Sequence, residues 1–117
     1  MSEERYAPEA GDLIWTDFDP RVGREQSGRR PAVVLSARTF FEASGFVIVC
    51  PITSRIREFG SSVKLPGNLP VAGEILTYQV RSLDIQSRPI RHAGGAVPDA
   101  LLTEVRAKLA VLCGMDF

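Results

Sequence analysis

The chain has 117 residues, 44% of them apolar and 24% charged, and its 14 basic side chains balance its 14 acidic ones. One domain takes up roughly 100–200 residues, so we expect a single domain over 1–117, with 1–10 as a loose lead-in. The composition excludes a disordered polyelectrolyte, and apolar runs such as 46–50 are far shorter than the roughly 20 residues of a membrane-spanning helix.

Segments rich in β-branched and aromatic residues alternate with turn-forming stretches, which is the pattern of short strands. The expected strands are 12–18, 31–36, 46–52, 61–65, 74–83 (one or two strands) and 88–93. The expected loops and turns are 19–30, 54–60 and 66–73. Pro31 suits a strand entry, where a missing amide hydrogen is tolerated.

The last segment, 98–113, has helical periodicity instead. Its apolar stripe is formed by Leu101, Leu102, Val105, Leu109 and Leu112. Glu104 and Lys108 form a favourable i,i+4 pair on the other face, and Pro98 and Gly114 suit the two helix ends. Short strands followed by one helix predict a small, strongly bent antiparallel sheet or barrel with the helix packed against it.

The N-terminus is acidic and has no apolar stretch, so we expect no secretory signal. Cys50 and Cys113 lie among apolar residues and are predicted to be buried free thiols. Two cysteines do not indicate a disulfide framework, and this favours a cytoplasmic location.

The balanced total charge hides an asymmetry along the chain. Residues 1–20 carry six acids and one base, a net charge of −5, whereas 21–91 carry eleven bases and five acids, a net charge of +6. Residues 92–117 have a net charge of −1. A polyanion could therefore meet a basic surface on this neutral molecule, unless folding scatters the charges evenly.

Few residues with catalytic or ligand chemistry are present. The single histidine, His92, lies in R-H-A-G-G, which we interpret as an exposed loop. One histidine excludes a two-histidine acid–base pair or metal site within a chain. The sequence has no metal-ligand cluster, nucleophile elbow, Walker loop or dinucleotide fingerprint, so we expect no metal and no cofactor.

The segment 19–36 is the most informative, because a charged, glycine-containing loop runs directly into a buried strand. It carries Glu25, Arg29 and Arg30. A loop anchored in this way is a suitable platform for a site, and the planar fork of arginine fits phosphate. The alternative is a solvated loop with incidental ion pairs.

Several motifs carry a resemblance to a known family. They are G-D-L-I-W-T-D-F-D-P at 11–20, G-R-E-Q-S-G-R-R-P-A-V-V-L-S at 23–36, V-C-P-I-T-S at 49–54, Q-V-R-S-L at 79–83 and E-V-R-A-K-L-A-V-L at 104–112. In this order and spacing, over about residues 5–114, the chain resembles the MazF/PemK family of toxin endoribonucleases, and its MazF members most.

This resemblance implies an SH3-like small β-barrel with a C-terminal helix, a fold shared with the gyrase poison CcdB, and a homodimer as the active form. It implies metal-independent cleavage of single-stranded RNA by attack of the 2′-hydroxyl on its adjacent phosphate. The products would be a 2′,3′-cyclic phosphate and a 5′-hydroxyl. The expected partner is a cognate MazE-like antitoxin whose acidic, disordered tail covers the RNA site.

By the same resemblance, the catalytic residues are Arg30 of the R-P step, Thr53 of the P-x-T step and Glu25 of the E-Q-x-G step. Arg30 would place two parallel N–H bonds on phosphate oxygens. Thr53 would donate its hydroxyl to phosphate, and Glu25 would accept a proton or aim Arg30. Because a guanidinium is hard to deprotonate, we assign Arg30 an electrostatic role. Candidate RNA-binding residues are Arg29, Gln26, Arg55, Arg57, Phe59, Gln79 and Arg81.

The aromatic residues divide between core and surface. Trp15 and Phe46 lie in predicted strands and are expected in the core, whereas Phe59, between charged loop residues, is the candidate for stacking on a base. Phe40 and Phe41 could belong to the core or to a dimer surface.

Two other functions stay open at this point. One is a non-enzymatic, CcdB-like poison that acts on a protein target, and the other is a binding module whose groove takes an acidic peptide. The fold alone does not separate them from a nuclease, because function depends on the site.

Overall fold

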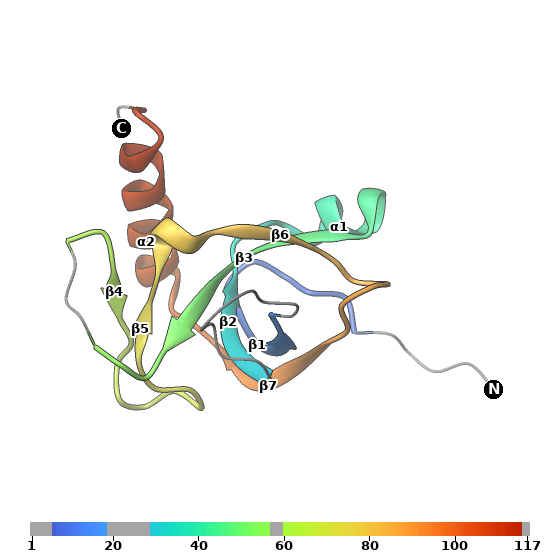
Figure 1. Ribbon diagram of the computed structural model, residues 1–117, viewed down its shortest axis with the longest axis horizontal. Helices are drawn as coiled ribbons and strands as arrows, with labels where there is room; N and C mark the ends of the chain where they lie inside the picture. Colours follow the sequence, from blue (N-terminus) through green and yellow to red (C-terminus); the bar gives the residue numbers. More distant parts are fainter. Residues whose placement is uncertain (1–5, 19–28, 57–59, 116–117) are drawn as a thin grey trace, which may run out of the picture.

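The computed structural model describes residues 6–18, 29–56 and 60–115 (Figure 1). The elements in chain order are β1 (Asp12–Asp17), β2 (Arg29–Val34), α1 (Arg38–Ser44), β3 (Phe46–Thr53), β4 (Val63–Lys64), β5 (Glu74–Ile75), the 3₁₀ turn η1 (Thr77–Gln79), β6 (Arg81–Asp84), β7 (Ile90–Ala96) and α2 (Asp99–Leu112). Within the described residues, none of the helices has the length and apolar character needed to cross a membrane.

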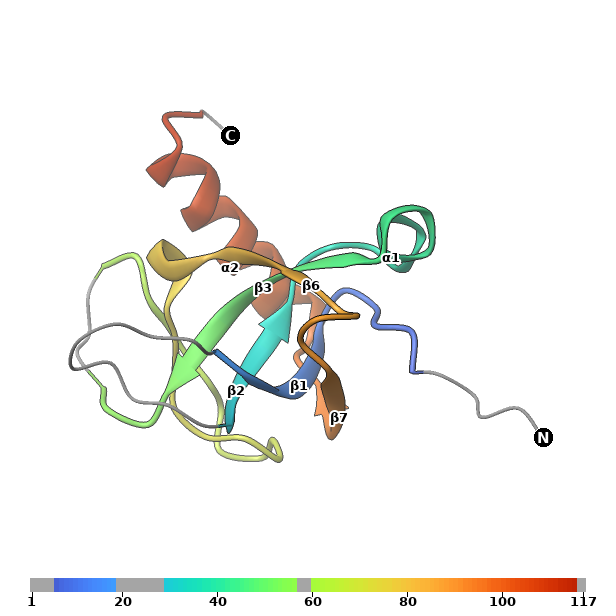
Figure 2. The ribbon, with the colours of Figure 1, turned by 45° about the vertical axis from the view of Figure 1, so that its right-hand side comes forward.

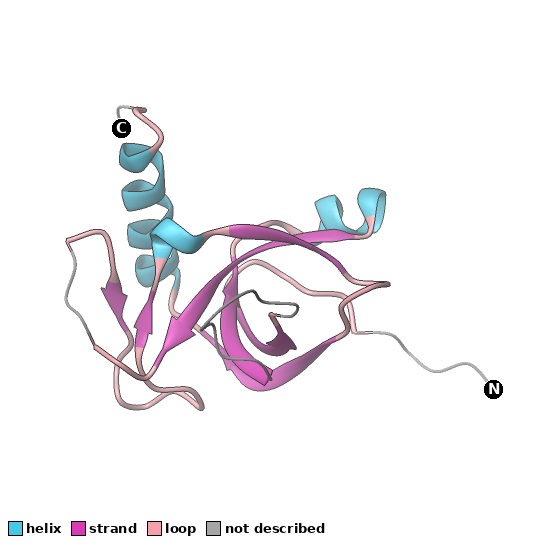
Figure 3. Ribbon diagram, viewed as in Figure 1, coloured by secondary structure: helices cyan, strands magenta, loops and turns pink. Residues whose placement is uncertain are grey.

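The strands form one antiparallel, strongly bent sheet in the order β4-β5-β3-β2-β1-β7 (Figure 3). The central strand β3 is the longest, and it pairs with β2 on one edge and with β6 and β5 on the other. Among the described residues no ladder joins β7 to β6 or β4, so the sheet curls like a barrel without closing. The predicted mainly β fold with a C-terminal helix is confirmed.

Two apolar cores lie on opposite faces of this sheet, because side chains alternate along each strand. The first core, which α2 covers, includes Leu13, Val33, Cys50, Ile52, Ile75, Leu102 and Val105. The second core consists of Ile14, Ala32, Val34, Val47, Val49 and Leu83, with Tyr6, Phe18, Ile85 and Ile90 packed against it. This alternation tells which face each strand residue occupies.

Most predicted strands lie where the alternation placed them, but 74–83 divides into β5, η1 and β6. The helix α1 was missed. It is short and has no buried residue, so it lacks an apolar stripe, and it ends at Gly45 with φ of 79°. Phe46 is 40% exposed, so its placement in the core was wrong, whereas Trp15 packs against the first core.

Two details of the C-terminal prediction were also wrong. Leu112 is 50% exposed and Cys113 is exposed, because the last turn of α2 extends beyond the sheet that covers Leu102 and Val105 (Figure 1). Cys50 is a buried free thiol as predicted, and burial raises its pKa to about 12.

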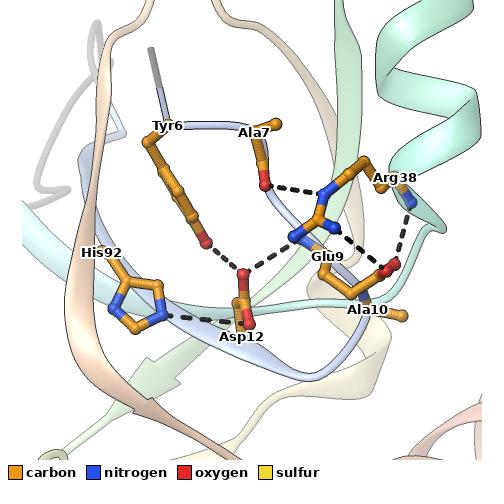
Figure 4. Close-up of polar contacts among 7 residues, drawn as sticks. All are labelled: Tyr6, Ala7, Glu9, Ala10, Asp12, Arg38 and His92. Atoms are coloured by element: carbon orange, nitrogen blue, oxygen red, sulfur yellow. Dashed lines mark hydrogen bonds and ion pairs between the residues drawn. The ribbon is translucent and has the colours of Figure 1, made fainter. Parts of the chain in front are cut away.

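Residues 6–10 are held by contacts rather than forming a loose lead-in (Figure 4). The Tyr6 hydroxyl and the Glu9 amide both donate to Asp12 Oδ2, the second over 3.0 Å. Arg38, at the start of α1, donates its amide to Glu9 Oε1 over 3.0 Å and its Nε to the Ala7 carbonyl over 3.2 Å. We call these five residues, together with His92, the N-terminal cluster.

His92 lies in β7, opposite Ile14 of β1, so its placement in a loop was wrong. Its Nε2 is 3.9 Å from Asp12 Oδ1, and its ring meets that of Tyr6 edge-on with the centroids 5.1 Å apart. Its Nδ1 accepts the Gly94 amide over 2.9 Å. The two glycines that follow His92 are typical of a loop, which is why the sequence predicted one, but this segment pairs with β1 as a strand.

Candidate active site

Strand pairing brings two of the residues expected to be catalytic to the same end of the sheet. Thr16 of β1 lies opposite Arg30 of β2, and Thr53 of β3 lies opposite Glu74 of β5. Between them, β2 and β3 pair Ala32 with Pro51. The β2–β3 ladder ends at this pair, and Arg30 and Thr53 each lie two residues beyond it, at the same end of the two strands. We call Thr16, Arg30, Thr53 and Glu74 the cross-strand row.

All members of the cross-strand row lie on the face of the second core. Thr16 is two residues beyond Ile14 and Arg30 two before Ala32, and both of these neighbours belong to that core. Thr53 and Glu74 alternate with Ile52 and Ile75, which point into the first core on the opposite face. The row therefore continues the second core at the end where its apolar residues stop.

Thr53 is half-buried, and one hydrogen bond orients its hydroxyl group. Oγ1 accepts the Arg55 amide over 3.1 Å, and a hydroxyl that accepts one bond can still donate its proton. Gly73, the residue before β5, comes very close to the backbone of Thr53, since a Cβ there would lie 2.2 Å from the Thr53 carbonyl oxygen. Gly73 also has φ of 134°, which favours glycine.

Arg30 is half-buried and Arg29, its neighbour, is exposed opposite Asp17. Alternation places the two arginines on opposite faces of β2, so only Arg30 shares a face with Thr53. Arg30, which the sequence placed at the end of the loop 19–30, is thus part of β2. Strand pairing therefore fixes the position of its backbone.

A second cation approaches the same face from β6. Arg81 pairs with Val49 and alternates with Leu83 of the second core, and its guanidinium carbon lies 5.2 Å from the centroid of the Phe18 ring. Phe18 follows β1 two residues beyond Thr16, so this cation–π pair borders the cross-strand row. The sequence alone did not assign Phe18 a role.

The remaining predicted residues are placed only in part. Gln79 is exposed on η1, and Arg55 is exposed just after β3. Glu25, Gln26, Arg57 and Phe59 lie outside the described residues. Arg88, which was not predicted, donates Nη1 to the Asp17 carbonyl over 3.0 Å and adds a cation at this end of β1.

Glu74 was missed as a member of the site. It is only 2% exposed, whereas glutamate at a strand start is ordinarily exposed, so nothing in the local sequence marks it. No three His, Cys, Asp or Glu side chains within the described ranges are grouped so that they could hold a metal ion. The site therefore consists of guanidinium, hydroxyl and carboxylate groups, which suit the binding and protonation of a phosphate.

Comparison with known proteins gives a consistent result. Residues 9–113 match the family of PemK-like, MazF-like toxins of type II toxin–antitoxin systems. The chain is 39% identical over 110 residues to the endoribonuclease toxin MazF of Escherichia coli K12, covering 94% of this chain and 97% of that one. It is 38% identical over 100 residues to the E. coli endoribonuclease toxin ChpB, covering 80% and 84% of the two chains.

Solved structures agree with these relatives. The crystal structure of MazF from Deinococcus radiodurans superposes with a TM-score of 0.86 at 43% identity, over 95% of this chain and all of that chain. A crystal structure of MazE–MazF from the same organism gives a TM-score of 0.85 at 43% identity, covering 96% of this chain and 100% of the matched one.

Proposed function

Because this chain belongs to the family of PemK-like, MazF-like toxins of type II toxin–antitoxin systems, we propose that it acts as an endoribonuclease on single-stranded RNA. The observation that supports this proposal is the cross-strand row, in which alternation along β2 and β3 puts Arg30 and Thr53 on the same face. The similar proteins MazF and ChpB are themselves endoribonuclease toxins.

In the proposed reaction, the 2′-hydroxyl oxygen bonds to the adjacent phosphorus and the bond from phosphorus to O5′ breaks. One proton leaves the 2′-hydroxyl and one reaches the O5′ leaving group, so the products are a 2′,3′-cyclic phosphate and a 5′-hydroxyl. The pentacoordinate phosphorane carries extra negative charge, and a cation with fixed hydrogen-bond donors lowers its free energy.

The residues divide this work by their chemistry. Arg30 supplies a positive charge, and its fork binds the two non-bridging oxygens. Thr53 adds its hydroxyl proton to a phosphate oxygen. Glu25 accepts the 2′-hydroxyl proton or aims Arg30.

RNA around the cleaved bond would lie along the basic residues of this face. Arg81 and Phe18 offer a stacked cation and ring, and base stacking on such platforms holds single strands without strong sequence preference. Specificity for a short sequence would come from the other predicted RNA-binding residues: Gln26, Arg55, Arg57, Phe59 and Gln79. Arg29 lies on the opposite face of β2 from Thr53, so it would contact RNA only where the strand wraps around that edge.

The proposed protein partner is a cognate MazE-like antitoxin with an acidic tail. Such a tail presents carboxylates, which arginine forks bind as they bind phosphate. It would therefore compete with RNA for Arg30 and its neighbours. We assign the chain to the cytoplasm, where both mRNA and the antitoxin are made.

We further propose that the active form is a homodimer. The C-terminal end of α2 exposes Val111, Leu112 and Met115 beside an apolar groove of about 310 Å³ that Leu35 and Ile48 help to line. Contiguous exposed apolar surface is typical of an interaction site. A second copy of the chain is the proposed occupant, and sedimentation is expected to report two chains per particle.

One assay tests the nuclease function. The protein is incubated with a long single-stranded RNA, with and without a chelator, and the new ends are mapped. We expect cuts at a short sequence, unchanged by chelator, that leave cyclic phosphate and 5′-hydroxyl ends. Inhibition by chelator would indicate a metal-dependent nuclease. Intact RNA would favour a CcdB-like poison or a peptide-binding module.

A further inference from the structure

A buried carboxylate lies next to the proposed catalytic hydroxyl. Glu74 is 2% exposed and lies directly opposite Thr53 on one side and Lys64 on the other. Directly opposite residues in an antiparallel pair project from the same face with their side chains in contact range. A carboxylate removed from water at this depth needs hydrogen bonds or a cation to offset its lost hydration.

Arg30 lies on the same face as this carboxylate and is long enough to reach it. Adjacent strands are about 4.8 Å apart, and Arg30 and Glu74 belong to the strands on either side of β3, so we expect about 10 Å between their backbones. The combined length of an arginine and a glutamate side chain spans this distance. Lys64 is exposed and keeps its amino group accessible to water.

We propose that Glu74 is a positioning residue, whose carboxylate holds the Arg30 guanidinium over Thr53. This inference rests on the proposed function, because the guanidinium is the group that would bind the phosphate. A carboxylate accepts N–H bonds from one edge of the guanidinium and leaves the other edge for the phosphate oxygens. It also restricts the rotamers of a long side chain before RNA binds, so less entropy is lost in the transition state.

This assignment separates two carboxylates by role. Glu74 lies in a strand and is proposed to act through Arg30, whereas Glu25 keeps the role of proton acceptor proposed for it above. The arrangement predicts that neutralising Glu74 misaligns Arg30 without removing it, which lowers the rate of the chemical step more than it weakens RNA binding.

The test compares Glu74→Gln, Glu74→Asp and the control Glu42→Gln, which lies on the exposed face of α1. We measure kcat and KM on a defined RNA, and the affinity for the same strand with a 2′-deoxy residue at the cleaved position. Glu74→Gln is expected to lower kcat about 10–100-fold with KM and affinity changed less than about twofold. Glu74→Asp is expected to recover part of kcat, and Glu42→Gln to match the wild type.

A double-mutant cycle separates positioning from a general structural effect. Once Arg30 is changed to Lys, the additional change Glu74→Gln is expected to lower kcat by less than about twofold. A loss of the same size in both backgrounds would overturn the proposal, as would a loss of activity that only follows the fraction of unfolded protein.

A measurement without RNA keeps this inference separate from the proposed function. The ¹⁵N spectrum of the wild type is expected to show a slowly exchanging Arg30 Nε–H, which Glu74→Gln shifts and speeds up and Glu42→Gln does not. If the wild type cuts no RNA but this signal behaves as expected, the nuclease function fails and the contact stands. If Glu74→Gln changes neither the chemical shift nor the exchange rate of Arg30 Nε–H, the proposed contact is wrong.

Discussion

The two ends of β1 carry polar groups of opposite character. At the Asp12 end, the N-terminal cluster pairs each group with another from the chain, and Asp12 accepts both the Tyr6 hydroxyl and the Glu9 amide (Figure 4). At the other end, Thr16 leads into the cross-strand row. Figures 1 and 2 agree that α1 and the β4–β5 hairpin lie at opposite ends of the sheet.

The difference shows how one sheet separates stability from function. Groups that satisfy one another inside the chain stabilise it and have little capacity left for a ligand. The Thr53 hydroxyl accepts the Arg55 amide, and in the proposed reaction it donates its proton to the phosphate. Substitutions at the two ends should therefore affect different measurements.

The largest effect is expected from the cross-strand row. Arg30→Ala and Thr53→Ala each remove one preorganised donor, and such a loss typically costs about 100–1,000-fold in rate. We expect RNA cleavage to fall by at least that factor while the circular dichroism spectrum and the melting temperature stay close to the wild type. Measurement of cut RNA over time checks this.

The matched control is Arg38→Ala at the opposite end of the sheet, where the side chain contacts Ala7 and Glu9. It removes a guanidinium of the same size and should leave the cleavage rate unchanged. Near-wild-type cleavage by Arg30→Ala or Thr53→Ala would show that the comparison between the ends is wrong.

A smaller loss is expected when the site is displaced rather than deleted. Gly73→Ala would place a Cβ 2.2 Å from the Thr53 carbonyl oxygen, at φ of 134°, so the backbone of β3 has to move. We expect a loss of more than about 1 kcal/mol in stability and up to about 100-fold in cleavage, since small displacements of a reacting group are costly.

Gly67→Ala is its control, because a Cβ there would meet nothing within 4 Å. It should cleave RNA and melt like the wild type. If Gly73→Ala kept full activity, then Thr53 would not need the position that this close approach fixes.

How much of this was predictable from the sequence depends on the kind of signal. Alternating apolar residues placed the main strands, and the motif resemblance named Arg30 and Thr53. The helix α1 has seven residues and none is buried, so its sequence carries no periodic pattern. The exposed end of α2 follows from where the sheet stops, which no stripe on the helix itself reveals.

The cross-strand row depends on long-range pairing, and this is why the sequence revealed only part of it. Glu74 joins Thr53 through a register that links residues 21 positions apart, and its burial depends on neighbours from other strands. His92 was mistaken for a loop residue for the same reason, since its partners Asp12 and Tyr6 lie about 80 residues earlier.

The N-terminal cluster offers a further contrast, with an effect on stability alone. Asp12→Asn weakens the acceptor of the Tyr6 hydroxyl and the Glu9 amide, and loss of such bonds costs about 1–3 kcal/mol. We expect urea unfolding at a lower midpoint and cleavage at the wild-type rate under native conditions. Tyr6→Phe removes one of the two hydrogen bonds, so its unfolding midpoint should lie between those of the wild type and Asp12→Asn. Equal losses of cleavage and stability would show that the two ends are not independent.

The smallest effect is a pH dependence at Glu9. The amides of Arg38 and Ala10 donate to its carboxylate and lower its pKa below the usual value of about 4.3. The charged form is therefore favoured in the folded state, so the stabilisation is complete above the unfolded pKa and is lost as pH falls through the folded pKa. The difference in melting temperature between wild type and Glu9→Gln should be present at neutral pH and shrink toward pH 3. The cleavage rate at neutral pH should be the same in both proteins. A difference in melting temperature that is constant over this pH range would show that the charge of Glu9 does not stabilise the N-terminal cluster.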